Sequence, residues 1–237
     1  MKNIKTIMTI VSALLVISFV TGCLSTPAET PAPTPKAKEQ EKTVLGWKGQ
    51  DYGSDKPEWV ADALVGDFSS LPESVQKKLE GKYTVVCEAK GTDLELAKEW
   101  ATNFGLNVGI ARELNAAVDA RFNGALSKNE KSQKTLVASA AKAKFTGFKK
   151  VTDTWVLNRT VDNRKKNFTD EYSVVMVYAI DQELFEKIAQ KYIADLIGEL
   201  PDSADMKKAE GMADELAKEL AKEISAKPGL VASGDAE

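Results

Sequence analysis

The longest predominantly apolar run of the chain lies near its start, from Ile7 to Val20, behind the basic residues Lys2 and Lys5. The run spans about 14 residues, whereas a membrane-spanning helix needs roughly 20. A basic start, a short apolar run and small residues at its end are typical of a secretory signal peptide. The pattern therefore predicts a leader over residues 1–22 and not a transmembrane helix.

The leader ends in Val20-Thr21-Gly22-Cys23, which resembles a bacterial lipobox. This resemblance implies that the Cys23 thiol is acylated with chains such as palmitate, and that the mature protein starts there. Two or three acyl chains hold a protein on a membrane far more firmly than one. Leu24 stands where an aspartate would retain such a lipoprotein in the inner membrane, which favours the outer membrane. An ordinary cleaved signal with an incidental cysteine is the alternative.

The strongest helical periodicity lies between residues 93 and 122. Its apolar residues recur at steps of three and four, so they would share one face of a helix about 45 Å long. They are Ala97, Trp100, Ala101, Phe104, Val108, Ala111, Leu114, Val118 and Phe122. Gly105 and Gly109 lie four residues apart on this helix. Local close packing explains them most simply, and a special interface role, in which another backbone comes close, is the alternative.

Three strands are expected around and after this helix, at 83–89, 151–157 and 172–180. In the first, Tyr83 and Cys87 would face one side and Val86 the other, because side chains alternate along a strand. The third is a nearly continuous apolar run, which is typical of a central strand covered on both faces. Further helices are predicted over 57–66, 72–79, 128–144, 181–200 and 203–226. The polar segment 158–170 is predicted as a loop, and the last ten residues as a frayed end.

These elements predict an α+β fold. A small, mostly antiparallel sheet of about three strands would pack against long helices, with an added charged C-terminal helix. Residues 23–46 hold Pro27, Pro31, Pro33 and Pro35 and few apolar side chains, so we expect an extended tether there. The predicted organisation is therefore a leader (1–22), the lipidated cysteine and tether (23–46), a globular domain (47–200), and a charged helix with a tail (201–237).

Composition excludes several classes of function. The chain has 32 basic and 35 acidic residues, and the leader contains two of the lysines and no acid. The acidic balance of the mature part argues against nucleic acid as a partner, because nucleic acid needs a basic surface. The absence of histidine removes histidine-based triads and histidine zinc sites. No motif in the sequence indicates a cofactor, a metal site or a catalytic residue, and an acylated Cys23 would leave Cys87 without a disulfide partner.

Between residues 56 and 195 the chain carries Pro57-Glu58-Trp59-Val60, a long alanine-bearing helix, Asp153-Thr154-Trp155, Tyr178-Ala179-Ile180-Asp181 and Phe185. With the lipobox, this order resembles the twenty-kilodalton outer-membrane lipoprotein family first recognised in Helicobacter. That family is related to the amino-terminal module of a flagellar assembly protein. The resemblance implies a small α+β domain at the outer membrane with a structural or interaction role and no known chemistry. The charged helix after Pro201 departs from the family pattern.

One basic cluster was found in the globular part: Arg159, Arg164, Lys165 and Lys166. It is a candidate contact for an anionic polymer or an acidic partner surface, since charge steers encounter, and a solvated hairpin tip is the alternative. We expect Cys87 to be a small buried hydrophobe.

The leading hypothesis is a non-enzymatic envelope lipoprotein, anchored by Cys23, that acts as a structural or protein-interaction module at the outer membrane. Its expected partners are the membrane, through the acyl chains, and other envelope proteins. Two alternatives remain. One is a ligand-binding lipoprotein with an apolar pocket between the sheet and the long helix. The other is a hydrolase of envelope polymers that uses carboxylates.

Overall fold

A five-stranded, mostly antiparallel sheet organises the computed structural model, which describes residues 40–122, 124–162, 166–200, 213–227 and 229–235. The strands are β1 (Gln40–Trp47), β2 (Lys82–Gly91), β3 (Lys149–Asp162), β4 (Asn167–Asp181) and β5 (Leu230–Asp235). Their order across the sheet is β1-β3-β4-β2-β5. Neighbouring strands are antiparallel except β2 and β5, which are parallel. The predicted α+β class is confirmed.

Two of the five strands are missing from the sequence prediction, which expected about three. β1 falls mainly in the segment assigned to the tether, and β5 falls in the tail expected to fray. Both are edge strands, and each pairs with one neighbour only: β1 with β3, and β5 with β2. Strand pairing through the backbone leaves little trace in a short sequence, so the apolar pattern alone did not identify them.

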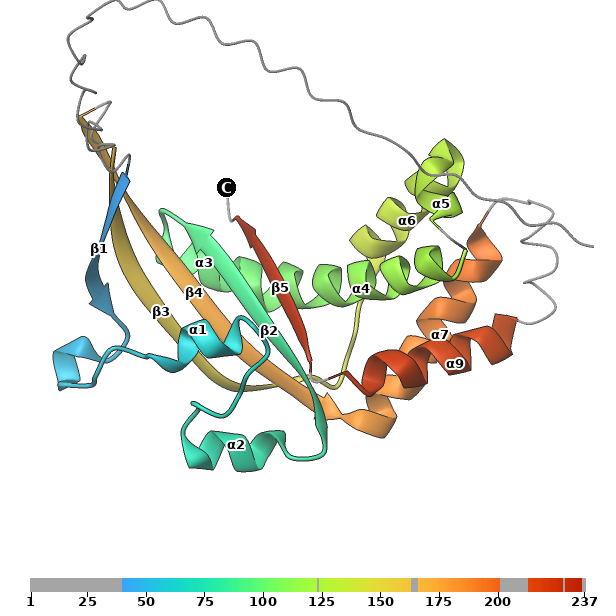
Figure 1. Cartoon of the computed structure of the whole chain (residues 1–237), viewed down its shortest axis with the longest axis horizontal. Coiled ribbons are helices and arrows are strands. Elements are labelled where there is room, and N and C mark those ends of the chain that lie inside the picture. Colours follow the sequence, from blue (N-terminus) through green and yellow to red (C-terminus); the bar gives the residue numbers. More distant parts are fainter. Residues whose placement is uncertain (1–39, 123, 163–165, 201–212, 228, 236–237) are drawn as a thin grey trace, which may run out of the picture. The chain divides into compact units, whose positions relative to one another are not determined.

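The described helices are α1 (Trp59–Ala63), α2 (Glu73–Leu79), α3 (Leu94–Glu99), α4 (Leu106–Arg121), α5 (Ala125–Lys128), α6 (Glu130–Lys142), α7 (Gln182–Glu199) and α9 (Ala213–Ser225). A π-helical turn, η2 (Trp100–Gly105), joins α3 to α4, and a short 3-10 turn, η1 (Gln50–Tyr52), follows β1. In Figure 1 the longer helices α4, α7 and α9 lie to the right of the sheet, and the short helices α1 and α2 lie at its lower left. The longer helices cover one face of the sheet, and α1 and α2 cover part of the other.

The central strands β2 and β4 are both buried on both faces, as predicted for β4. Tyr83 and Cys87 face the longer helices, whereas Val86 faces α1 and α2. On the helical side, the Tyr83 and Phe185 rings stack with centroids 3.7 Å apart, which joins β2 to α7. The sheet thus separates a larger core, under the longer helices, from a smaller core under α1 and α2. Trp155 packs against the larger core and Trp59 against the smaller one, and both side chains are half-buried.

The long helix is confirmed as a continuous 28-residue element, but its buried face differs from the prediction. A π turn contains an extra residue compared with an α turn, so the face rotates where η2 lies. Phe104, predicted to be buried, is 57% exposed, whereas Leu106 and Ile110 lie in the core. The hydroxyl of Thr102 within this turn donates to the Lys98 carbonyl at 2.8 Å.

The prediction of a loop over the polar segment 158–170 is wrong for most of its length. β3 continues to Asp162 and β4 begins at Asn167, so most of this segment forms paired strands. Its polar side chains find partners across the strands, as Arg159 does with Asp170. Cross-strand charge pairs stabilise a sheet without apolar side chains, so the hydropathy pattern missed this part of the hairpin.

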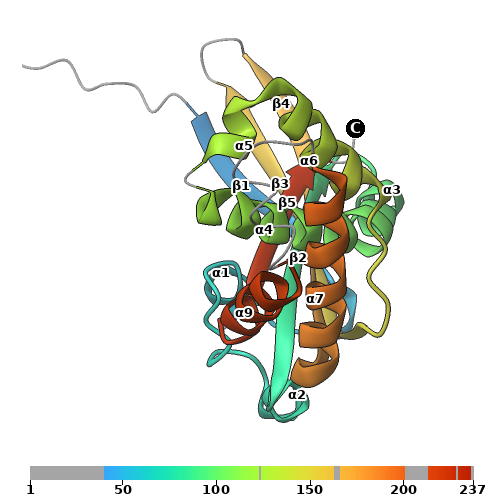
Figure 2. The ribbon, with the colours of Figure 1, turned by 90° about the vertical axis from the view of Figure 1, so that its right-hand side faces the viewer.

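The charged helix predicted at 203–226 is seen as α9 over Ala213–Ser225, and residues 201–212 lie outside the described part of the chain. Its narrow apolar stripe is buried, including Leu220 and Ile224. α9 lies beside α7 (Figure 2) and also contacts α4. The stripe therefore packs on the domain.

Gly105 and Gly109 serve local packing. A Cβ at Gly109 would come 2.3 Å from the Cβ of Ala232, so this glycine lets β5 approach α4 closely. A Cβ at Gly105 would come 2.7 Å from the ring of Trp100. In contrast, a Cβ at Gly198 of α7 would meet nothing within 4 Å.

Gly109 and Gly198 provide a matched test of the close contact between α4 and β5. Gly109→Ala should lower the free energy of unfolding by about 1–3 kcal/mol, because the new methyl overpacks the contact with a rigid alanine. Gly198→Ala should raise it by up to about 1 kcal/mol, because alanine favours helix. Urea unfolding of both variants measures the difference. A Gly109→Ala protein as stable as the unchanged chain would show that α4 and β5 do not touch as described.

Candidate functional site

Arg159 lies in β3, and its charge already has a partner. Its Nε and Nη2 each donate to the carboxylate of Asp170 at 2.7 Å. The hydrogen bonds from Arg159 lower the pKa of Asp170, and the same pair raises the pKa of Arg159. The guanidinium also lies 4.1 Å from the centre of the Phe168 ring. Arg159 therefore has a carboxylate partner within the hairpin.

The rest of the predicted basic cluster is only partly described. Lys166 is exposed and has a positive φ of 55°, at the turn between β3 and β4. Arg164 and Lys165 lie outside the described residues, as does Cys23. The structure thus brings Arg159 and Lys166 to one hairpin, but it commits Arg159 to Asp170.

The side chains around Arg159 form a half-exposed surface that we call the hairpin face. Strand pairing places its members on the side of the sheet that carries the larger core: Trp155, Leu157, Arg159, Val161, Phe168, Asp170 and Tyr172. The rings of Trp155 and Tyr172 pack edge to face, with their centroids 5.7 Å apart. Phe168 is 60% exposed. The hairpin face is therefore more aromatic and apolar than basic.

A cavity of about 460 Å³ lies at the opposite end of β4, and we call it the lysine-rimmed pocket. Four lysines line it: Lys78 of α2, Lys82 of β2, and Lys149 and Lys150 of β3. The remaining lining residues are mostly apolar, and they are Gly147, Val151, Ala179, Ile180, Asp181 and Leu184. Asp181 caps α7 and accepts hydrogen bonds from the backbone N–H groups of Glu183 and Leu184 at 3.1 and 3.3 Å.

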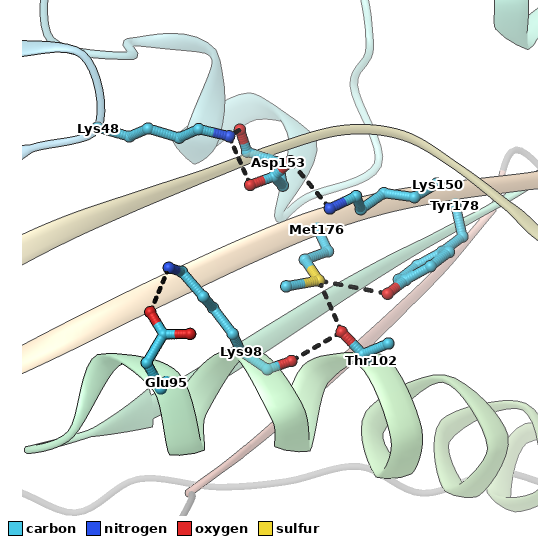
Figure 3. A network of polar contacts seen from close by, with 8 residues as sticks. All are labelled: Lys48, Glu95, Lys98, Thr102, Lys150, Asp153, Met176 and Tyr178. Carbon is cyan, nitrogen blue, oxygen red and sulfur yellow. Dashed lines mark hydrogen bonds and ion pairs between the residues drawn. The ribbon is translucent and has the colours of Figure 1, made fainter.

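One lysine of the pocket belongs to an ion network that leads away from it (Figure 3). Lys150 Nζ lies 3.2 Å from one oxygen of Asp153, and Lys48 Nζ lies 2.6 Å from the other. Burial opposes ionisation of Asp153, but the hydrogen bonds from these two lysines outweigh it and lower the pKa of the carboxyl. Lys150 therefore has a carboxylate partner. In the described part of the chain, no ion pair engages Lys78, Lys82 or Lys149.

The same view shows that the π turn is tied to β4 through sulfur. The hydroxyls of Thr102 and Tyr178 lie 3.5 and 3.2 Å from the Met176 sulfur (Figure 3). Burial is the main cause that raises the pKa of Tyr178, so its phenol stays protonated at neutral pH. These contacts hold the helix on the sheet and offer no reactive group.

Cys87 is fully buried, and burial raises the pKa of its thiol to about 12. A nucleophilic cysteine needs a lowered pKa and access to solvent. The structure thus agrees with the expectation of a small buried hydrophobe. Among the residues it describes, no group of three or more Cys, Asp or Glu side chains could hold a metal ion.

No protein-family model, curated protein or solved structure matches the chain. The resemblance to the outer-membrane lipoprotein family therefore depends on the sequence motifs alone. None of the described helices combines the length and the apolar character needed to cross a membrane.

The lysine-rimmed pocket was missed in the sequence analysis. Its three lysines without ion pairs come from segments about 70 residues apart in sequence, and only the sheet brings them together. One signal in the sequence could have pointed to the pocket: each of these lysines lies at or next to the end of a helix or strand.

Proposed function

We propose that this chain is a non-enzymatic envelope lipoprotein, held at the outer membrane by acyl chains on Cys23, whose folded part acts as a structural or protein-interaction module. The single observation that carries the proposal is the lipobox-like end of the leader at Cys23. The hairpin face supports the interaction role, because exposed aromatic side chains are enriched where proteins meet. Phe168 is the most exposed aromatic residue on that face.

The electrostatics of the described carboxyls favour this role over a carboxylate-based hydrolase. A general acid needs a raised pKa at neutral pH. The carboxyls with a clear shift all have a lowered pKa: Asp67 through hydrogen bonds from Ser69, Asp153 through its two lysines despite burial, and Asp170 through Arg159. They are ionised at neutral pH and cannot donate a proton there.

Packing also disfavours an apolar binding pocket between the central strands of the sheet and the long helix. Ala101, Ile110 and Leu114 of that helix are at most 1% exposed and lie in one core with the sheet. A ligand between these layers would have to displace core side chains. The lysine-rimmed pocket lies at the end of the sheet, and a second cavity of about 370 Å³ lies at the sheet edge between the long helix and β5, where Arg112 and Glu113 are among the lining residues.

Palmitate labelling of growing cells tests the anchor. The unchanged chain should incorporate palmitate and sediment with outer membranes, because acyl chains partition into the bilayer. Cys23→Ser should lose both the label and the membrane association. Cys87→Ala is the matched control, since it removes the other thiol and should keep both. Lipid-free mature protein in the medium would refute the anchor.

Photocrosslinking in cells tests the interaction surface. A photoreactive phenylalanine analogue at position 168 should capture an envelope protein, because this ring is exposed on the hairpin face. The same analogue in place of Val137, which is 66% exposed on α6, is the control and should capture several-fold less. Equal capture at both positions, or none at either, would remove the hairpin face from the proposal.

A further inference from the structure

The lysine-rimmed pocket has an unusual charge for this chain. The whole sequence has a net charge of −3, yet three lysines without ion pairs line one cavity. Like charges around one cavity repel each other, and an anion placed among them would offset that repulsion. Among the described residues that line the pocket, Asp181 is the only acid, and its carboxylate already accepts two hydrogen bonds at the start of α7. The rim therefore favours an anion.

The floor of the pocket is apolar. Ile180 is buried, and Leu184 of the amphipathic helix α7 is 43% exposed. Gly147 closes one side with a φ of +94°, and a Cβ there would come 3.2 Å from the end carbons of both Ile180 and Leu184. Any larger residue at this position would be strained and would fill the floor. Glycine keeps the apolar floor open.

Size and chemistry together define the ligand. About 460 Å³ lies within the range of pockets that hold small molecules. Lysine ammonium groups act as point charges and do not require the planar fork that arginine offers to a carboxylate. We propose that the lysine-rimmed pocket binds a small amphiphilic anion, with its carboxylate or phosphate among Lys78, Lys82 and Lys149 and its apolar body against Ile180 and Leu184.

Methyl NMR of the full chain carrying Cys23→Ser tests this proposal without detergent and independently of the anchor. Octanoate should shift the methyl signals of Val151, Ile180 and Leu184 in a saturable way and leave buried Leu126 unchanged. Acetate lacks the apolar body and octanol lacks the charge, so each should bind at least tenfold more weakly. Octanoate shifts no larger than those of acetate would overturn the proposal.

A charge-matched pair of variants tests the lysines. Replacing Lys78, Lys82 and Lys149 together by glutamine should weaken octanoate binding at least tenfold and leave octanol binding unchanged. These side chains are exposed, so the fold should survive, and the thermal midpoint checks this. The control replaces the exposed Lys128, Lys131 and Lys142 by glutamine and should bind octanoate normally. Equal weakening in both variants would mean a net-charge effect and would overturn the proposed site.

Two further ligands identify the source of the anion. Octyl phosphate should bind as octanoate does, because the lysines accept either head group. Phosphatidylglycerol vesicles that displace octanoate and shift the same methyl signals would identify a lipid head group as the ligand, in support of the same site. Vesicles without effect, together with saturable octanoate binding, would identify a free amphiphile.

Discussion

The antiparallel pairing of β2 with β4 is the constraint on which the rest of the structure depends. Residues 82–91 pair without interruption with residues 172–181, and this pair is buried on both faces over most of its length. One face carries the longer helices through contacts such as Tyr83 on Phe185, and the other carries α1 and α2 through Val86 and Val177. Apolar burial is the main favourable contribution to folding, so the arrangement of the helices follows from this strand pair.

That arrangement places the two candidate binding surfaces at opposite ends of β4. At one end β4 extends beyond β2 from Asn167 to Glu171, pairs only with β3 and exposes the hairpin face. At the other end β4 runs into α7 beside the lysine-rimmed pocket. Between these ends the helix–sheet layer is filled by side chains such as Ile110 and Leu114. A binding role at the ends therefore fits this fold better than a cleft in its middle.

Periodicity predicted those parts of the fold that burial determines. The central strands, the long helix, α7 with its Asp181 cap and the stripe of α9 could all be predicted, because their apolar residues repeat at the spacing of the element. The edge strands β1 and β5 depend on backbone pairing, and the π turn depends on a local fit of Trp100 against Gly105 and Gly234. Neither interaction produces a repeating pattern of apolar residues in the sequence. The lysine-rimmed pocket depends on long-range strand pairing, which single residues in a sequence do not reveal.

Native-state hydrogen exchange tests the central role of the β2–β4 pair most directly. Amides of Val85–Ala89 and Val175–Ala179 should exchange slowest, at the rate set by global unfolding, because both faces of these strands are covered. Amides of β1 and β5 should exchange faster through local opening at the sheet edges. If the edge strands or α9 were the slowest to exchange, while β2 and β4 opened first, the structure would depend on a different interaction and this account of it would be wrong.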